Sequence, residues 1–277
     1  MSESLAVERQ GPVGLVTMNR PEKHNAFDDV LIAELTEALR SMEGEDGIRV
    51  VVLSAAGKSF SAGADLNWMK RMAGFSKDEN QRDAMGLGAL MRTLAHLRKP
   101  TVARVQGPAY GGGVGLVACC DIAVATQHAS FSFSEPKLGL IPAVISPYAI
   151  AAIGERAARR YFLTGERFDA GEAWRLGLVH ELVMSEGELD EKVGELVDAL
   201  LACGPVAQRE GKELIRAVAG KPVTSELIQD TAERIARIRS SPEGREGVSA
   251  FLEKRRPAWI PPDPEPVVPP EAPPPTI

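Results

Sequence analysis

The chain has 277 residues, of which 44% are hydrophobic and 25% are charged, a composition that is ordinary for a soluble globular protein. Its formal net charge of −6 at pH 7 argues against a nucleic-acid partner bound over a broad face, and no apolar run approaches the roughly 18 to 20 residues of a membrane span. Residues 1–10 are acidic and poor in apolar side chains, so they do not predict a signal peptide.

The first half of the chain alternates strand-like and helix-like segments. Residues 13–18 and 49–53 are rich in β-branched and apolar side chains, which predicts strands. Between them, apolar residues recur at helical spacing, which predicts an amphipathic helix over about 26–43. Further short strands are expected at 101–105, 122–125 and 130–133, with a helix at about 112–120. This order of elements, with glycines at the turns, indicates an α/β fold.

Helical patterns dominate after about residue 144. Helices are expected at 147–163, 170–176, 186–202, 205–219 and 225–240, with one strand near 179–183. A final helix should start at Ser241, where a capping hydroxyl precedes a first-turn proline and an acid, and should run to about Arg256. Residues 257–277 contain 10 of the 20 prolines and no Lys or Arg, so we expect this tail to be disordered or polyproline-like.

Two short segments rich in small residues, SAGADL at 61–66 and GGGVG at 111–115, carry the strongest functional signal. Each is expected at the end of a strand, and the second is expected to open a helix. Two backbone N–H groups brought together in this way can bind a carbonyl oxygen that becomes negative during a reaction. The pattern therefore predicts a site that stabilises an enolate or a tetrahedral oxyanion without a metal. The alternative is that the three glycines only allow a helix to pack closely on a sheet.

Two other enzyme classes receive less support from the sequence. Residues 113–118 match the loose dinucleotide pattern G-x-G-x-x-A, but residues 106–110 separate this pattern from the preceding strand, so we expect no nicotinamide cofactor. No G-x-S-x-G segment is present, which argues against an ordinary serine hydrolase.

Cysteines and histidines add constraints on location and metal content. The three cysteines are odd in number, and Cys119 and Cys120 are adjacent and make poor disulfide partners, so a reducing cytoplasm is the expected location. The four histidines show no spacing typical of metal ligands. We therefore expect no metal.

The chain resembles the enoyl-CoA hydratase/isomerase (crotonase) family in a series of segments that follow the family's order and spacing. These segments are NRPEKHNA at 19–26, FSAGADL at 60–66, GPAYGGG at 107–113, CDIA at 120–123, FSEPKLGLIP at 133–142, and a last one at 246–255 that ends in AFLEKR. Each is modest evidence alone, but together they extend over almost the whole chain and leave only the proline-rich tail outside.

The resemblance implies an α/β fold built as a crotonase-like spiral of ββα units, with a C-terminal helical region that mediates oligomerisation. Residues 1–200 would form the spiral core with the acyl-CoA site, residues 201–256 the helical region, and residues 257–277 the tail. The resemblance further implies a homotrimer or a hexamer and an acyl-CoA thioester as substrate. No separate cofactor is expected, because coenzyme A arrives as part of the substrate.

The resemblance also assigns residues to the site. It implies that the backbone N–H groups of Ala64 and Gly112 hold the thioester oxygen and that Glu135 acts as acid and base. Residues implied to contact the substrate or its coenzyme A portion are Lys23, Ala26, Ala62, Asp65, Leu66, Gly111, Phe251 and Lys254. Glu135 has an alternative role in a solvated surface pair with Lys137. The basic cluster at 254–256 also has an alternative role, which is to complement the dipole at the C-terminal end of the last helix.

Two-carboxylate hydratases of this family carry a second glutamate, and the corresponding position here is Gly115. A single carboxylate can take a proton from water and return one to carbon, or it can move a proton between the α- and γ-carbons. Both routes pass through the same enolate, so the number of carboxylates leaves hydration and double-bond isomerisation open. A non-enzymatic RNA-binding or scaffold protein is a third alternative, against which the retained Glu135 and the negative charge argue.

A finer resemblance favours hydration. NWM at 67–69, GVGL at 113–116 and AVISP at 143–147 resemble a branch of the family that contains bacterial methylglutaconyl-CoA and isohexenylglutaconyl-CoA hydratases. The implied reaction is the reversible hydration of 3-methylglutaconyl-CoA to 3-hydroxy-3-methylglutaryl-CoA in leucine metabolism. Such substrates carry a free carboxylate, which a cation should meet. Lys70, Arg71 and Lys137 are the candidates for that cation.

Overall fold

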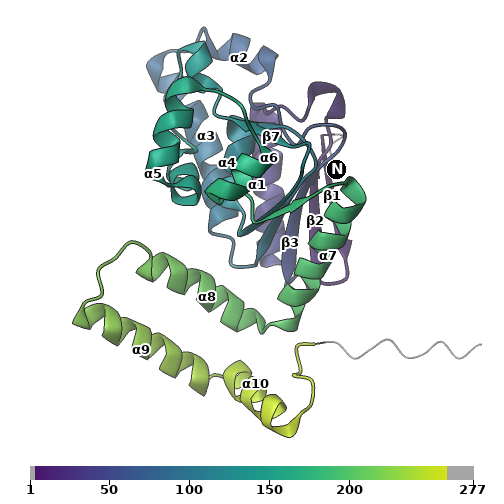
Figure 1. Cartoon of the computed structure of the whole chain (residues 1–277), viewed down its shortest axis with the longest axis vertical. Coiled ribbons are helices and arrows are strands. Elements are labelled where there is room, and N and C mark those ends of the chain that lie inside the picture. Colours follow the sequence, from purple (N-terminus) through teal and green to yellow (C-terminus); the bar gives the residue numbers. More distant parts are fainter. Residues whose placement is uncertain (1–3, 261–277) are drawn as a thin grey trace, which may run out of the picture. The chain divides into compact units, whose positions relative to one another are not determined.

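The computed structural model describes residues 4–260, and the contacts divide the chain into two compact units, Met1–Lys221 and Pro222–Ile277 (Figure 1). The resemblance implied a core over residues 1–200 and a helical region over 201–256, whereas the division by contacts lies after Lys221 and groups residues 201–221 with the larger unit. The predicted site residues that precede Lys221 therefore belong to one unit, and those on the last helix belong to the other.

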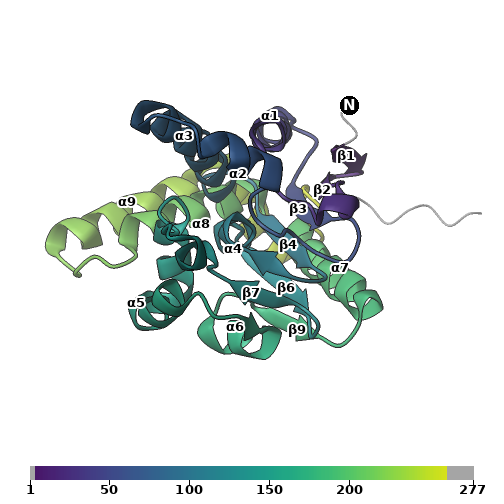
Figure 2. The same cartoon turned by 90° about the horizontal axis from the view of Figure 1, so that it is seen from above.

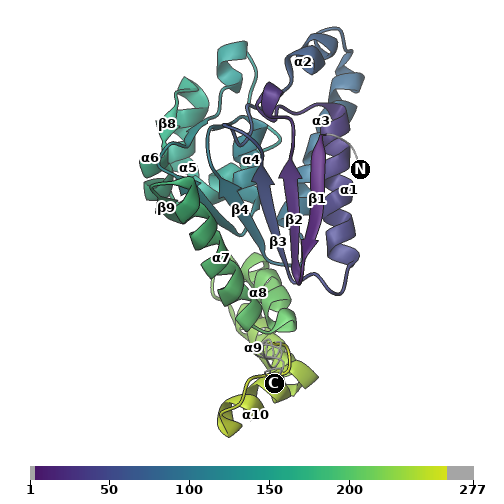
Figure 3. The same cartoon turned by 90° about the vertical axis from the view of Figure 1, so that its right-hand side faces the viewer.

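The larger unit is built around one large and one small β-sheet (Figure 3). The strands are β1 Leu5–Gln10, β2 Val13–Met18, β3 Val50–Ala55, β4 Thr101–Val105, β5 Ala109–Tyr110, β6 Ile122–Thr126, β7 Ser130–Ser132, β8 Phe168–Asp169 and β9 Glu181–Val183. The large sheet has the order β1-β2-β3-β4-β6-β9, and the small sheet has the order β5-β7-β8. β1 is antiparallel to β2, and the other neighbours in the large sheet are parallel.

The helices follow the strands in the order expected of an α/β chain. They are α1 Asp29–Gly44, α2 Leu66–Met72, α3 Lys77–Ala95, α4 Gly112–Cys119, α5 Ser146–Thr164, α6 Ala170–Leu176, α7 Glu186–Ala202, α8 Pro205–Val218, α9 Ser225–Ser240 and α10 Pro242–Glu253, with two short 3-10 helices, η1 Pro21–Lys23 and η2 Glu135–Leu138. Within residues 4–260, no helix combines the length and the apolar character that a membrane crossing requires.

Strand β3 shows why the central strands are apolar along their whole length. Its side chains alternate between the two faces of the sheet, and both faces are covered, as is usual for parallel strands. Val51 and Leu53 pack into the core formed with α1, α3 and α4, while Val50 and Val52 pack against α7 on the other face (Figure 2). Burial of these side chains supplies the main driving force for folding of this unit.

The strands and helices predicted from the sequence are present, with small shifts at several ends. Elements that the sequence did not predict are β1, α2, α3 and the short strands β5 and β8. β1 is extended because it pairs with β2 through a tight turn at Gly11, where φ is 57°, and not because of its own apolar content. α3 starts at a capping box formed by Ser76 and Glu79.

The last helix is shorter than predicted. The expectation that it would run to about Arg256 is wrong, because α10 ends at Glu253. Lys254 adopts a left-handed conformation with φ 54°, and its N–H donates to the carbonyl oxygens of Ala250 and Phe251. This arrangement closes the helix at its end.

The segment after α10 begins with residues that pack on this helix. Ala258 N donates to Glu246 Oε1 at 2.8 Å, and a β-carbon added at Gly247 would lie 2.9 Å from Cη2 of Trp259. The tail predicted for 257–277 therefore starts with residues that have fixed contacts. From residue 261 on, the prediction of disorder lies outside the described residues.

Helix α8 is held to its unit by polar contacts, since none of its residues is buried. Lys212 Nζ forms an ion pair with Asp121 Oδ2 and donates to Lys99 O at 3.0 Å. Arg216 Nη2 donates to Ala95 O at 2.9 Å. These contacts attach α8 near the amino ends of β4 and β6, at the edge of the sheet opposite the carboxyl ends of the parallel strands.

Candidate functional site

Loops that follow the parallel strands β2, β3 and β4 meet at the carboxyl edge of the large sheet, which is where open α/β sheets bind ligands. Figure 3 shows β2 and β3 ending on the side of the sheet where α2 lies. Asn25, after β2, donates to the carbonyls of Ala56 and Ser59 at 2.8 Å each. Gln106, after β4, donates to the carbonyls of Ala55 and Ser59 at 2.8 and 3.2 Å. Two side-chain amides thus join the three loops.

The two segments rich in small residues, 61–66 and 111–115, lie side by side. Ser61 N donates to Pro108 O at 3.1 Å, and Tyr110 N donates to Ser61 O at 2.8 Å. A β-carbon added at Gly113 would lie 2.9 Å from Ser61 Cβ. The two segments predicted to act together are therefore in contact at the start of α4.

The backbone at Ala64 leaves one N–H group available. Phe27 N donates to Gly63 O and Asp65 N donates to Phe27 O, both at 2.7 Å. In an extended segment, the peptide groups of neighbouring residues point to opposite sides, so the N–H of Ala64 points away from Phe27. Among residues 4–260 this N–H donates no hydrogen bond. An N–H in such a position can donate to a ligand.

Gly112 supplies a second N–H of this kind. It is the first residue of α4, and its N–H also donates no hydrogen bond within residues 4–260. The first turn of a helix has N–H groups without intrahelical partners and carries the positive end of the helix dipole. Gly111, with φ 50° and ψ −120°, makes the turn into the helix. A β-carbon at Gly112 would lie 2.9 Å from Phe27 Cε2, so the close packing here requires glycine.

Glu135 starts η2, directly after the loop that follows β7, and its carboxylate lies beside the turn at Gly111. A β-carbon added at Gly111 would lie 3.3 Å from Glu135 Oε1. The other oxygen, Oε2, is buried and has no hydrogen-bond partner among the described residues. Burial raises the pKa of this carboxyl above its usual value, against a smaller opposite effect of a backbone hydrogen bond. A carboxyl group with a raised pKa and a buried, unpartnered oxygen is a candidate for proton exchange with a bound molecule.

The alternative of a solvated pair between Glu135 and Lys137 does not match the contacts. The Lys137 side chain runs along Gly165, where an added β-carbon would lie 3.4 Å from Lys137 Cγ. The hydrogen bond from Arg160 is the main cause that lowers the pKa of Glu166, and the charge of Lys137 adds the smallest contribution. Within the described residues, Glu135 has no ion pair.

The position of the missing second glutamate is filled by apolar side chains. A β-carbon at Gly115 would lie 3.0 Å from Ile145 Cβ and 3.1 Å from Met91 Cε, and closer still to Ile145 Cγ2. Ile145 is 2% exposed and Met91 is fully buried, so neither can swing into solvent. Sequence reasoning did not identify Ile145 at this place. No local signal pointed to it, since it lies thirty positions along the chain from Gly115.

Lys23 and Asp65, two predicted contacts of the coenzyme A portion, form an ion pair with each other. Lys23 Nζ lies 3.6 Å from Asp65 Oδ2, and the Lys23 side chain is 45% exposed. Burial by itself raises the pKa of Asp65, but the amide N–H groups of Trp68 and Asn67, with the charges of Lys23 and Arg20, bring the pKa below its usual value. Asp65 is thus a buried anion that accepts hydrogen bonds from the first turn of α2, while part of the Lys23 side chain is exposed to solvent.

The other predicted contact residues of the larger unit lie in the same loops. Ala26 is buried, and its carbonyl accepts a hydrogen bond from Arg20 Nη1 at 3.2 Å. Ala62 is exposed, and its N–H donates to His24 O at 2.9 Å. Leu66 opens α2 and is 74% exposed. Ala62 and Leu66 can therefore touch a ligand through their side chains, whereas Ala26 contributes to the framework of the loop.

Phe251 and Lys254 belong to the smaller unit, at the end of α10. Phe251 is 82% exposed, and Lys254 is exposed as well. Their predicted role at the coenzyme A portion stays a prediction, because these two residues are described only within their own unit.

Of the three cations considered for a distal carboxylate, Arg71 is held in an ion pair, whereas Lys70 and Lys137 are exposed and form no ion pair among the described residues. Arg71 Nη2 pairs with Asp29 Oδ1 at 2.6 Å. Lys137 lies along Gly165, as described above. Lys70 is exposed on α2, next to the 61–66 segment, and the described residues offer it no ion pair. Of the two unpaired lysines, Lys70 is the one next to the 61–66 segment.

The site differs from a dinucleotide loop in the placement of its glycines. In a dinucleotide-binding fingerprint the first glycine makes the turn before the helix. Here Gly113 and Gly115, which match that pattern, lie inside α4 and are buried. In the part of the chain that the structure describes, no three His, Cys, Asp or Glu side chains are grouped as metal ligands.

Comparisons with known proteins bear on the family and the fold of the chain. The family described as enoyl-CoA hydratase/isomerase matches residues 8–261. The crystal structure of an enoyl-CoA hydratase from Shewanella pealeana is 45% identical, with a TM-score of 0.90 and coverage of 92% of this chain and 96% of that one. A crystal structure from Legionella pneumophila, named for enoyl-CoA hydratase/isomerase (crotonase), is 49% identical, with a TM-score of 0.88 and coverage of 93% and 99%. The short-chain-enoyl-CoA hydratase of Clostridium acetobutylicum is 30% identical over 91% of this chain and 96% of its own length. The predicted crotonase-like α/β fold is thereby confirmed.

Proposed function

Because the chain belongs to the enoyl-CoA hydratase/isomerase family and is an enzyme of the enoyl-CoA hydratase type, we propose that it reversibly hydrates 3-methylglutaconyl-CoA to 3-hydroxy-3-methylglutaryl-CoA. The observation that carries this proposal is the buried, unpartnered Oε2 of Glu135 beside the glycine-rich start of α4. A carboxylate there can exchange protons with a substrate whose carbonyl oxygen is held by backbone N–H groups.

In this proposal the N–H groups of Ala64 and Gly112 bind the thioester oxygen. Neither donates within the described residues, so binding the substrate breaks no existing hydrogen bond. As water adds to C3, negative charge moves to the thioester oxygen, and both hydrogen bonds strengthen. An interaction that strengthens in the transition state lowers the barrier rather than only tightening binding. One such donor typically contributes about 3–4 kcal/mol.

Glu135 carries out both proton transfers of the reaction. Its carboxylate takes a proton from water while the water oxygen bonds to C3, and the electron pair of the double bond moves into the thioester to form the enolate. Glu135 then returns a proton to C2, so that H and OH are added across the bond and nothing else is consumed. Burial, which raises the pKa of Glu135, makes the protonated intermediate state less costly.

The apolar filling at Gly115 supports a mechanism with one carboxylate. Ile145 and Met91 occupy the space into which a second glutamate would project, and they offer no group that exchanges protons. Glu135 then carries out both proton transfers, from water and to C2, so H and OH add to the double bond from one side.

The proposed substrate carries a second carboxylate at the far end of its acyl chain, and Lys70 would meet it. The support is that Lys70 is exposed, has no ion pair within residues 4–260, and lies on the helix that directly follows the 61–66 segment. A charge-assisted hydrogen bond from this ammonium would favour dicarboxylic acyl thioesters over simple ones.

The proposal includes a homotrimer or hexamer in the cytoplasm that needs no cofactor beyond the coenzyme A of its substrate. Exposed large apolar side chains gather on α9, on α10 and just before α9: Val223, Ile228, Ile235, Val248, Phe251 and Leu252. Apolar surface of this kind is usually covered by another subunit. The three cysteines are free, which fits a reducing compartment.

The proposal is tested with a panel of enoyl thioesters with and without a terminal carboxylate. Water addition is followed by loss of the enoyl-thioester absorbance, and double-bond migration is followed by its appearance from a 3-enoyl thioester. We expect hydration, with the highest kcat/KM for 3-methylglutaconyl-CoA. Migration without hydration would make the enzyme an isomerase, which the single carboxylate also permits. A preference for thioesters without the terminal carboxylate would contradict the proposed substrate.

A further inference from the structure

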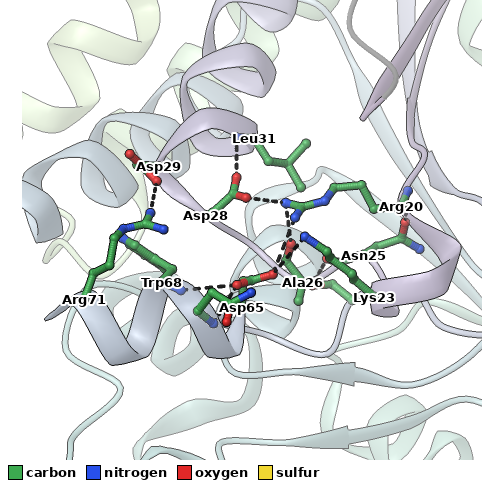
Figure 4. A network of polar contacts seen from close by, with 12 residues as sticks. Arg20, Lys23, Asn25, Ala26, Asp28, Asp29, Leu31, Asp65, Trp68 and Arg71 are labelled. Atoms are coloured by element: carbon green, nitrogen blue, oxygen red, sulfur yellow. Dashed lines mark hydrogen bonds and ion pairs between the residues drawn. The ribbon is translucent and has the colours of Figure 1, made fainter. Parts of the chain in front are cut away.

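Arg20 is a buried cation to which the proposed reaction assigns no role. It lies between β2 and η1, and only 8% of its side chain is exposed. A buried guanidinium requires partners for its N–H groups. Nη1 donates to Asp28 Oδ2 at 2.7 Å and to Ala26 O at 3.2 Å, and Nη2 donates to Asp65 Oδ2 at 3.4 Å. Figure 4 shows the guanidinium between the two carboxylates.

Both carboxylates that Arg20 holds also cap helices. Oδ1 of Asp28 accepts the N–H of Leu31 in the first turn of α1 at 2.9 Å. Oδ1 of Asp65 accepts the N–H of Asn67 in the first turn of α2 at 2.8 Å. Each aspartate therefore uses one oxygen for its helix and the other for the same guanidinium. One side chain joins the starts of two helices that are far apart in the sequence.

This junction lies directly beside the proposed oxyanion donor. Phe27 and Ala64 pair as an isolated parallel bridge, and Asp28 and Asp65 are the residues that follow them in the chain. The bridge fixes the two backbone segments at Phe27 and Ala64 relative to each other. Arg20 fixes the residues that follow them, Asp28 and Asp65, where α1 and α2 begin. The direction of the Ala64 N–H depends on both constraints, because it lies between the bridge and the Asp65 cap.

We propose that Arg20 is a positioning residue that fixes the direction of the Ala64 N–H by holding the caps of α1 and α2 together. The inference rests on the proposed use of that N–H as a donor to the thioester oxygen. Without the guanidinium, Asp28 would lose its ion pair and Asp65 would keep only the longer pair with Lys23, and the repulsion between the two partly buried carboxylates would separate the helix starts. A displacement of about 1 Å at a group that acts in the transition state can cost about 100-fold in rate.

A lysine cannot replace Arg20 in this role. The planar guanidinium presents several N–H groups in a fixed geometry, whereas an ammonium is a compact point charge on a flexible stem. Arg20→Lys keeps the charge but cannot hold both carboxylates and the Ala26 carbonyl in the same geometry. It should therefore restore stability better than it restores the direction of the N–H.

The experiment compares Arg20→Met, Arg20→Lys and Asp28→Asn with the wild type and with the control Lys212→Met. The control removes the ion pair between Lys212 and Asp121, which lies at the opposite edge of the sheet. It is a matched control because the Lys212 side chain, like that of Arg20, is largely buried, with 10% of it exposed. For each protein we measure Tm, kcat and KM for but-2-enoyl-CoA, and the C=O stretching frequency of bound butanoyl-CoA labelled with ¹³C at the thioester carbon. The frequency reports hydrogen bonding to the thioester oxygen without any turnover.

We expect Arg20→Met to lower kcat by about 10- to 100-fold with KM changed little, and to return the C=O frequency toward its value in solution. For Arg20→Lys and Asp28→Asn, kcat and the C=O frequency should lie between the values of Arg20→Met and the wild type. These two variants test the inference if Arg20→Met does not fold. Lys212→Met should lower Tm and leave kcat and the frequency unchanged.

Wild-type kcat and frequency in the Arg20 variants would overturn the inference, as would an equal loss of both in Lys212→Met. If the wild type lowers the C=O frequency but hydrates no enoyl thioester, the proposed reaction is wrong. Loss of the frequency change in the Arg20 variants would then still support the positioning role. A wild type that leaves the frequency at its solution value would overturn the positioning role itself.

Discussion

Replacing Gly115 with alanine tests whether Ile145 and Met91 fill the place of the missing second glutamate. A β-carbon at residue 115 would lie 3.0 Å from Ile145 Cβ and 3.1 Å from Met91 Cε, whereas non-bonded carbon atoms normally stay about 3.5–4.0 Å apart. Both side chains are buried, so the clash must be relieved by shifts inside the core.

The size of the effect follows from two opposing contributions. Overpacking a closed core costs about 1–3 kcal/mol, and exchanging glycine for alanine inside a helix recovers up to about 1 kcal/mol. We therefore expect Gly115→Ala to lower the free energy of unfolding by about 1–2 kcal/mol, which corresponds to a loss of about 2–8 °C in Tm.

The assay is urea unfolding followed by circular dichroism at one fixed protein concentration, in the wild type and in Ile145→Ala. Ile145→Ala removes Cγ2, the atom nearest to the new methyl group, and leaves the Cβ of residue 145 and Met91 Cε in place, so Gly115→Ala should cost less in that background than in the wild type. The two substitutions should then couple by about 1 kcal/mol. Gly194→Ala is the matched control, because Gly194 lies inside α7 with no atom within 4 Å of an added β-carbon. That substitution should stabilise by up to about 1 kcal/mol.

Equal costs of Gly115→Ala in the two backgrounds would show that Ile145 does not occupy this place. A gain in stability like that at Gly194 would show that the space is open. Either result would refute the steric explanation for the single carboxylate.

The remaining predictions concern the proton-transfer group, the acyl end and the tail. Glu135→Gln should lower kcat by about 10²- to 10⁴-fold with KM nearly unchanged, because it keeps the shape and loses the basicity, and an unchanged rate would remove Glu135 from the mechanism. Since burial raises the pKa of Glu135, kcat/KM for hydration should fall with decreasing pH through a midpoint above the usual glutamate value of about 4.3, and a midpoint at or below that value would contradict this assignment. The same raised pKa means that stability contributed by the protonated carboxyl is lost as pH rises through it, so Glu135→Gln should unfold at higher urea than the wild type at pH 7. Lys70→Ala should reduce kcat/KM for 3-methylglutaconyl-CoA by about tenfold or more and leave but-2-enoyl-CoA unaffected, whereas equal losses on both would assign Lys70 to the coenzyme A portion or to stability. Deleting residues 261–277 should leave the hydration rate intact, because the contacts of Trp259 with α10 are kept, and a large loss of rate would mean that the deleted residues bind to the protein.

The elements that the sequence predicted well are those with a short-range pattern. Val13–Met18 became β2 without a shift, because β-branched and apolar residues follow one another there. Ala170–Leu176 became α6, where the side chain of Asp169 caps the first turn. α3 was missed because its first half is polar, and its buried residues, Leu90, Met91 and Leu94, are confined to its last turns.

The ends of elements depended on backbone conformations that residue type does not specify. α10 stops at Glu253 because a lysine, which is not a residue typical of left-handed conformation, adopts it at the helix end. Residues 258–260 have defined positions because the Trp259 ring packs beside Gly247 of α10. Composition alone assigned residues 257–277 to a proline-rich tail, because composition does not show that the Trp259 ring packs beside Gly247.

The sequence by itself determined the family, the two glycine-rich segments and Glu135, because those motifs are short, ordered along the chain and tied to a known chemistry. Only the tertiary structure showed that Ile145 and Met91 occupy the space at Gly115, that Lys23 is paired with Asp65, and that Arg20 joins the starts of α1 and α2. The physical reason is that each of these contacts joins residues far apart in the chain. Periodicity and propensity describe near neighbours, whereas packing and ion pairing depend on which distant segments folding brings together.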